Sequence, residues 1–167
     1  APRRFLRIIA GPSPPRFSTG SGRDELAATV VDTQNPLTYR VFVNRVWQHH
    51  FGVGLVRTPS NFGSLGESPT HPELLDWLTS EFIARGLSLK SLHRLIMTSA
   101  TYQLSSNYDE HSYQADSDNR LYWRMNPRRM DVEALRDSIL FVTGELDSSL
   151  GGPGYLDTKE SMRRTGS

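Results

Sequence analysis

The sequence has 167 residues, which fits a single domain long enough to bury its own core. Its 19 basic and 18 acidic residues leave a net charge of +1, whereas proteins that bind nucleic acid usually carry a strong basic excess. We therefore expect no nucleic-acid partner. The chain lacks cysteine, which excludes disulfides, thiolate nucleophiles, cysteine-ligated metals and covalent haem attachment within it. It also lacks an apolar run of about 18 residues, so we predict no membrane span.

Composition divides the chain into three parts. Residues 1–22 are rich in proline, glycine and serine, and they predict an extended arm or linker. Residues 23–150 have the pattern of a helical domain. Residues 151–167 begin at a Gly-Gly-Pro-Gly break, and we interpret them as a truncated tail that leads to a missing C-terminal part. Because the chain begins with alanine rather than methionine, we interpret it as a fragment of a longer protein, with its targeting signal upstream.

The apolar periodicity of the middle part predicts an all-α, orthogonally packed helical domain with long irregular loops. A short helix over 23–31 precedes the strongest pattern, a helix over 36–51 that Asn35 caps and Pro36 opens. After a loop over 52–69 we predict one helix that begins at a capping box of Thr70 and Glu73 and another that Ser88 caps. A mobile surface loop follows over 105–119. Asp131 then caps a last helix, whose inward-facing residues are Val132, Leu135, Ile139, Val142 and Leu146.

The predicted helix over 36–51 is apolar on two faces, which is typical of a central helix with neighbours on both sides. One face contains Tyr39, Phe42, Val43, Val46, Trp47 and His50, and the other contains Leu37, Val41, Asn44 and Gln48. If the second face is buried, both amides need partners, because an unmet buried polar group costs ~1–3 kcal/mol. We expect Asn44 and Gln48 to clamp the loop that follows, and the alternative is that they orient a ligand.

Four runs of sequence, over residues 35–52, 58–78, 88–103 and 119–137, are long and specific. Together they resemble the planctomycete-specific domain family that is described as domain of unknown function 1553. The resemblance covers most of the chain. It supplies no reaction and no catalytic residues.

The resemblance implies a module of large bacterial proteins that are often exported, so the implied location is periplasmic or extracellular. Such proteins commonly carry a second planctomycete-specific domain and a c-type haem domain upstream. We therefore expect the neighbouring domains of the parent protein as partners. The family also continues beyond Arg163, which implies that part of the domain core is missing from this chain.

Histidines and nearby carboxylates have the ligand types that suit zinc; the set is His49, His71 and His93 with Glu73 or Asp76. His71 lies in the first turn of its predicted helix, where the helix dipole favours the neutral imidazole that a metal requires. No His-Glu-x-x-His spacing supports this metal site, and capping or packing is the alternative role for His71. We expect His50, on the apolar face, to be a core histidine bonded to a backbone carbonyl.

Arginines and carboxylates alternate over residues 120–137. Arginine forms bidentate pairs with carboxylates and also captures anions. With so many acids nearby we expect an internal ion-pair network, which includes Glu133 and Arg136 one helical turn apart, and the alternative is an anion or sugar-sulfate site. Polar residues of the helix over 36–51 belong to the same candidate set. The set, a structural polar network or an anion site, is Asn44, Arg45, Gln48, Arg124, Arg128, Arg129, Asp131, Glu133, Arg136 and Asp137.

These patterns favour an uncharacterised, non-catalytic binding or scaffold module of a larger exported protein, with polysaccharide as a further partner. The alternative is a hydrolase or metal-assisted enzyme domain that acts on an extracellular polymer through His49, His71, Glu73 and nearby arginines. No phosphate-binding glycine loop and no Gly-x-Ser-x-Gly motif is present. We expect no cofactor in this chain, and a c-type haem would belong to an upstream domain.

Overall fold

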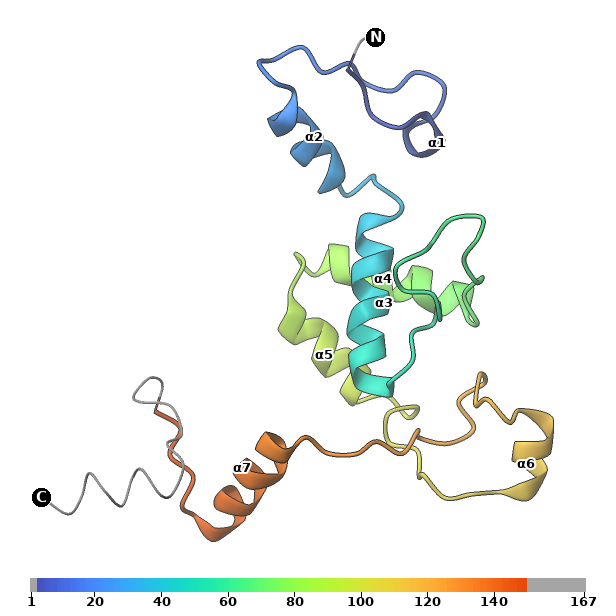
Figure 1. Cartoon of the computed structure of the whole chain (residues 1–167), viewed down its shortest axis with the longest axis vertical. Helices are drawn as coiled ribbons and strands as arrows, with labels where there is room; N and C mark the ends of the chain where they lie inside the picture. The colour runs from blue at the N-terminus through green and yellow to red at the C-terminus, as the bar shows by residue number, and fades with distance from the viewer. Residues whose placement is uncertain (1–2, 150–167) are drawn as a thin grey trace, which may run out of the picture. The chain divides into compact units, whose positions relative to one another are not determined.

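The computed structural model describes residues 3–149, and among these it contains seven α-helices and no β-strand. The predicted all-α fold is confirmed. The helices are α1 (Arg7–Ala10), α2 (Arg23–Val30), α3 (Thr38–Phe51), α4 (Pro72–Ala84), α5 (Leu89–Met97), α6 (Glu110–Ala115) and α7 (Val132–Thr143), as Figure 1 shows. In the described part of the chain, none of them has the length and apolar character needed to cross a membrane.

The chain divides into two compact units, Ala1–Arg128 and Arg129–Ser167. The domain boundaries predicted after residues 22 and 150 stay predictions. The tail predicted over 151–167 lies outside the described residues.

The segment before α2 is held by hydrogen bonds. An isolated antiparallel bridge joins Arg4 and Arg16 on either side of α1. The Glu25 carboxylate of α2 accepts from the backbone N–H groups of Ser18 and Thr19, each at 3.0 Å. The arm predicted to be extended therefore contains a short helix and folds back on itself, because its two ends pair with each other and Glu25 of α2 holds the turn that follows.

The helix α3 begins at Thr38, two residues later than predicted. Asn35 does not cap it: the Asn35 side-chain oxygen accepts from the Leu37 N–H at 3.0 Å, and its amide nitrogen donates to the Val30 carbonyl at 3.2 Å. Asn35 thus forms a turn that joins the end of α2 to the start of α3. The helix ends at Phe51, as predicted.

The core of the first unit forms where α4 and α5 pack against α3. Figure 1 shows α4 crossing α3 rather than running alongside it. The buried apolar side chains of this core are Tyr39, Val43, Val46, Trp47, Phe51, Leu55, Val56, Leu75, Leu78, Phe82, Leu92 and Ile96. Val43 and Asn44, which point to different sides of α3, are both fully buried. The prediction of a central helix with neighbours on both sides is confirmed.

The buried side chain of Asn44 holds the loop that follows α3. Its amide nitrogen donates to the Val56 carbonyl at 3.0 Å, and its oxygen accepts from the Val56 N–H at 2.8 Å. Gly54 lies so close that a Cβ atom there would be 2.8 Å from the Asn44 amide. The half-buried Gln48 side chain makes no hydrogen bond to the described residues. The expected clamp on the loop is therefore made by Asn44.

The starts of α4 and α5 differ in how they are capped. The capping box predicted for Thr70 and Glu73 is wrong, since α4 has no side-chain cap and the Thr70 hydroxyl donates to the Leu55 carbonyl at 3.3 Å. A buried loop carbonyl thus competes successfully for the hydroxyl. The cap predicted for α5 is confirmed, because the Ser88 side chain accepts from the Ser91 N–H.

The polar segment predicted as a loop over 105–119 contains the short helix α6. The Asp109 side chain caps it by accepting from the Ser112 N–H at 2.8 Å. The helix has no buried residue, so it shows no apolar period in the sequence.

In the second unit, α7 forms over nearly the predicted residues, but its apolar face does not point inward. The residues predicted to be buried have exposed fractions of 78% at Val132, 50% at Leu135, 56% at Ile139, 84% at Val142 and 38% at Leu146. The predicted cap is also wrong, since the Asp131 side chain makes no capping hydrogen bond. Periodicity identifies the face of a helix that needs a partner, and it carries no information on where that partner lies.

Candidate functional site

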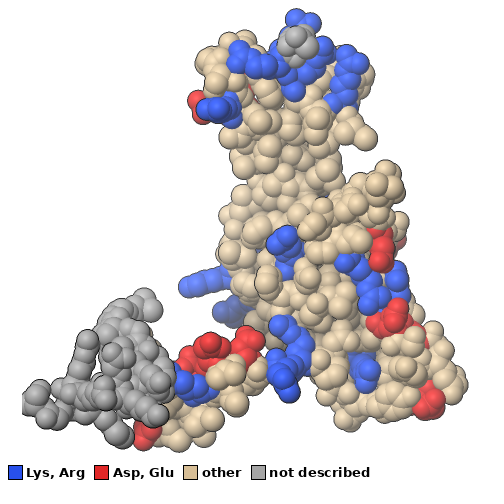
Figure 2. Space-filling model, in the orientation of Figure 1, with Lys and Arg blue, Asp and Glu red and all other residues tan. Residues whose placement is uncertain are grey.

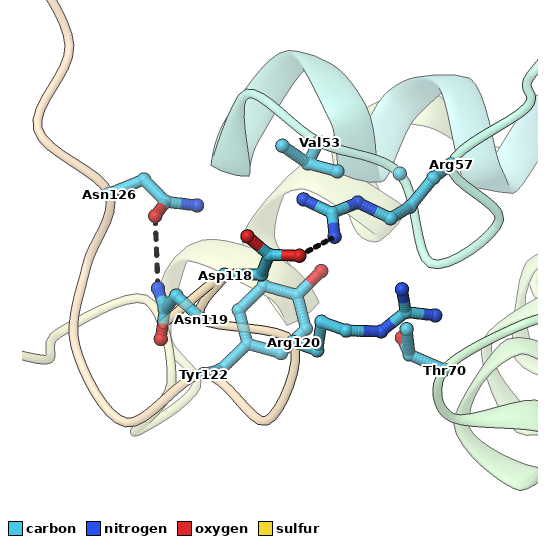
Figure 3. Close-up of a pocket in the computed structure, with 9 residues that line it drawn as sticks. Val53, Arg57, Thr70, Asp118, Asn119, Arg120, Tyr122 and Asn126 are labelled. Carbon is cyan, nitrogen blue, oxygen red and sulfur yellow. Dashed lines mark hydrogen bonds and ion pairs between the residues drawn. The ribbon is translucent and has the colours of Figure 1, made fainter. Parts of the chain in front are cut away.

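A small pocket lies beside the loop that follows α3 and the turn that follows α6, as Figure 3 shows. The lining side chains that matter for its chemistry are Arg57, Thr70, Asp118, Arg120 and Tyr122. The cavity has a volume of about 10 Å³, which is room for about one water molecule. The site is therefore built for a small polar group.

Tyr122 forms the floor of the pocket. Its ring packs edge-on against Trp47 and Phe51, with centroids 5.5 Å and 5.4 Å away, and it lies 5.6 Å from the ring of His71. The Trp47 indole N–H donates to the Tyr122 hydroxyl oxygen at 2.7 Å. Burial raises the pKa of Tyr122, and the hydrogen bond from Trp47 and the charge of Arg57 oppose that rise. The hydroxyl therefore stays protonated at neutral pH.

The backbone of the pocket is strained at two positions. Asn119 and Tyr122 have φ values of 51° and 55°, a region that residues other than glycine rarely adopt. Asn119 is nearly buried, and its amide nitrogen donates to the Arg124 carbonyl at 2.8 Å and to the Asn126 side chain at 3.0 Å. The surrounding contacts thus impose a conformation that costs of order 1–3 kcal/mol per residue. Strain of this kind is concentrated at ligand-binding and switch regions.

Two arginines line the pocket, and each forms a single long ion pair with a carboxylate. Arg57 and Asp118 lie 3.5 Å apart, and Arg120 and Glu67 lie 3.6 Å apart. The Asp118 side chain is 67% exposed, whereas that of Arg57 is only 26% exposed. Both distances exceed those of a strong charge-assisted hydrogen bond. The pocket thus contains cationic donors that are weakly neutralised.

A second cluster of functional groups lies where α3 meets α5. His50 Nε2 and His93 Nδ1 are 2.7 Å apart, and the ring of Tyr102 packs edge-on against His50. One imidazole must donate and the other must accept, so the contact requires a neutral ring. Burial lowers the pKa of His50, and the nearby charges of His93, His49 and Arg128 lower it further. The predicted bond from His50 to a backbone carbonyl is replaced by this histidine pair.

The residues predicted as metal ligands occupy separate environments. His49 is exposed on α3, His71 contacts the Thr70 hydroxyl at 3.0 Å, and His93 pairs with His50. Glu73 is exposed in the first turn of α4. Over residues 3–149, no group of three or more histidine, aspartate or glutamate side chains is arranged to hold a metal ion. The structure therefore does not bring the predicted zinc ligands together.

Asp76, the other predicted carboxylate, pairs with Arg40 at 2.6 Å. This pair lies on an open cleft of about 330 Å³ between α3, α4 and the loop of residues 62–69. A second, more apolar groove of about 270 Å³ contains Trp47 and the half-exposed Trp77. Both are large enough for part of a larger ligand.

The arginines predicted to form an ion-pair network have other partners in the first unit. The Arg124 guanidinium lies 4.7 Å from the ring centroid of Trp123, and its buried Nε atom has no hydrogen-bond partner in the described part of the chain. Arg128 donates to the carbonyls of His49 and His50 at the end of α3. Arginine here covers an aromatic ring and caps a helix terminus, because those acceptors lie nearer than the acids.

In the second unit, the predicted pair of Glu133 and Arg136 is replaced by Arg136 and Asp137 at 3.1 Å. Arg129, Asp131 and Glu133 are exposed and take part in no ion pair among the described residues. Arg45, on α3, is exposed as well. Figure 2 shows basic and acidic side chains interspersed over much of the face in view, with arginines gathered over the N-terminal segment. The arginines of that segment are Arg3, Arg4, Arg7 and Arg16.

The sequence alone did not point to the pocket. Arg57 lies 61 residues before Asp118 in the chain, and no catalytic or ligand-binding motif links it to Asp118 and Tyr122. The left-handed backbone at Asn119 and Tyr122 is also invisible in the sequence, because neither residue is a glycine. Only Asn119 is of a type that favours this conformation.

The chain matches the model of a protein family. A family model described as "Protein of unknown function (DUF1553)" matches residues 22–166, which confirms the resemblance found in the sequence. No curated protein and no solved structure matches the chain.

Proposed function

This chain belongs to the DUF1553 family of proteins of unknown function, and we propose that it is a non-catalytic binding or scaffold module of a larger exported bacterial protein. Its partners are then the neighbouring domains of that protein, which in a planctomycete-type architecture include a c-type haem domain. Its location is periplasmic or extracellular. The chain's own residues attach no c-type haem, because they include no cysteine.

The observation that carries this proposal is the exposed apolar stripe of α7. Val132, Leu135, Ile139 and Val142 recur at the spacing of one helix face, and each is at least half exposed. The helix lies inside the region matched by the family model, so it belongs to the domain. Contiguous exposed apolar surface of this kind marks an interaction site. We assign the stripe to a neighbouring domain of the parent protein.

A further feature supports a binding role. The groove that contains Trp77 offers an aromatic side chain on which a sugar ring can stack. Polysaccharide is therefore the second partner that we propose.

Amide hydrogen exchange tests the proposal most directly. We expect the amides of α7 to exchange faster in this chain alone than in the full parent protein, where the partner covers the stripe. Ile139→Asp should remove that added protection. Ala134→Asp, which adds the same charge to another face of α7, should preserve it. Equal exchange of α7 in the chain and in the parent protein would contradict the assignment.

The alternative is a hydrolase or metal-assisted enzyme that acts on an extracellular polymer. The observation that favours it is the pair of His50 and His93, since a neutral imidazole with a lowered pKa can act as a general base or as a metal ligand. Elemental analysis of the untagged protein tests this alternative. Stoichiometric transition metal that is lost in His93→Ala would favour the enzyme over the scaffold.

A further inference from the structure

In the pocket of Figure 3, the two members of an ion pair differ in their exposure to water, and this difference points to a ligand. Arg57 is largely withdrawn from water, but its partner Asp118 is mostly in water and 3.5 Å away. A guanidinium that has lost much of its hydration needs close acceptors, and a single long contact to an exposed carboxylate supplies little. The Arg57 guanidinium, which lines the pocket, is therefore only weakly neutralised.

The pocket also contains a hydroxyl donor without an acceptor. The Tyr122 oxygen accepts from the Trp47 indole, so the Tyr122 hydrogen is free to be donated. Among residues 3–149, no hydrogen-bond acceptor takes it. The charge of Arg57 acts on the Tyr122 hydroxyl and lowers its pKa, and both side chains line the pocket drawn in Figure 3. The strained backbone at Tyr122 places the ring in this position at an energetic cost.

Arg120 supplies a third donor on the side of the pocket near Thr70. Its acidic partner Glu67 is 3.6 Å away, and the side chains of both residues are nearly half exposed. Such exposed pairs contribute only about 0–1 kcal/mol, so a better acceptor can displace Glu67. Two guanidinium groups and one hydroxyl thus converge on a space that their own acids fill poorly.

We propose that this pocket binds a carboxylate group of a ligand on Arg57, Arg120 and Tyr122, in exchange with the protein's own Asp118. The planar guanidinium of arginine matches the two oxygens of a carboxylate. The cavity itself has room for about one water molecule, so the ligand's carboxylate takes the exposed position of the Asp118 carboxylate beside Arg57 rather than filling the cavity. This inference is independent of the docking role of α7, and its test involves no residue of that helix.

The test is a titration of the whole chain with sodium acetate at constant ionic strength, followed by the NMR signals of the Trp47 indole N–H and the Arg57 side chain. We expect saturable shifts of both signals. Arg57→Gln should abolish the saturable shift of Trp47. Arg85→Gln, which removes an exposed arginine paired with Glu81, should leave it unchanged. Equal weakening by the two substitutions would show non-specific charge effects and overturn the proposal.

Asp118→Asn provides the sharper test, because it removes the internal competitor. We expect acetate to bind two- to fivefold more tightly to this variant, the range that an exposed ion pair of up to about 1 kcal/mol allows. A variant that merely unfolds cannot bind more tightly, so a gain in affinity is specific to the proposed exchange. Absence of saturable shifts in both the natural chain and Asp118→Asn would overturn it.

Titrations with other ligands identify the chemistry of the bound group and the kind of molecule that carries it. Sulfate is the comparison anion, and equal affinity for sulfate and acetate would overturn the assignment to a planar carboxylate. Glucuronate and a tripeptide with a free C-terminus represent a sugar acid and a protein terminus. Whichever of these binds more tightly than acetate names the source of the group.

Discussion

The helices α5 and α7 both have an amphipathic pattern, but their surroundings differ. Each carries leucine and isoleucine at helical spacing, and the apolar residues of α7 were predicted to face inward. In α5, Leu92 and Ile96 are buried to within 2% exposure, whereas α7 has no buried residue. The difference teaches that an amphipathic pattern reports the need for a partner, and that this need can be met inside the chain or outside it.

The largest effect that tests this comparison is the loss of a core isoleucine. Ile96→Ala should lower the free energy of unfolding by about 2–5 kcal/mol, because it removes buried methyl groups and leaves a cavity. The matched substitution Ile139→Ala should change it by no more than about 0.5 kcal/mol, because Ile139 is 56% exposed. Urea unfolding followed by circular dichroism measures both. Equal losses would show that α7 is buried in solution.

An effect of similar size is expected at the clamp on the loop after α3. Asn44→Ala leaves the buried N–H and carbonyl of Val56 without partners, and each orphaned group costs about 1–3 kcal/mol. Gln48→Ala, one turn along the same helix, should have little effect, because its side chain contacts no polar partner in the described residues. Thermal unfolding of the two variants compares them. An equal loss at Gln48 would mean that the clamp involves both amides.

The smallest effect is a dependence of stability on pH at the contact between α3 and α5. Burial, His93, His49 and Arg128 lower the pKa of His50 in the folded state below the ordinary value of 6.5. The unfolded chain therefore takes up the proton first as the pH falls. The stability from neutral His50 is present above about pH 6.5 and is lost as the pH falls through the lowered pKa.

Urea unfolding at several pH values measures this dependence. His50→Gln should flatten the decline in stability below pH 6.5, since it removes the titrating group. His111→Gln changes an exposed histidine of α6 and should keep the decline of the natural chain. Acid should loosen α5 while leaving the hydrogen exchange of α7 unchanged. The same slope in His50→Gln and in the natural chain would place the titrating group elsewhere.

Much of the fold could be predicted because its signals are local. The centre and end of α3, the Ser88 cap of α5 and the helix at α7 follow from side chains within a few residues of one another. The capping box at Thr70 failed because a carbonyl fifteen residues earlier in the chain, that of Leu55, took the hydroxyl. The short helix α6 was missed because it buries nothing and so leaves no period.

The candidate site could not be predicted from the sequence, because its contacts are not local. Its groups lie far apart in the sequence: Trp47 bonds to Tyr122, and Arg57 faces Asp118. Prediction from arginine and acid content in residues 120–137 named the right kind of residue and the wrong pairs. Pairing depends on which acceptors tertiary contacts bring within a few ångströms, and charge spacing along the chain does not report this.

By itself the sequence determined the all-α class, the central helix and the membership in DUF1553. These follow from periodicity, capping and long specific runs of residues. Only the tertiary structure decided which apolar faces are covered, that His50 meets His93, and that Arg57, Arg120 and Tyr122 converge on one pocket. Burial and convergence are properties of distances in space, and a helix pattern fixes orientation about its own axis alone.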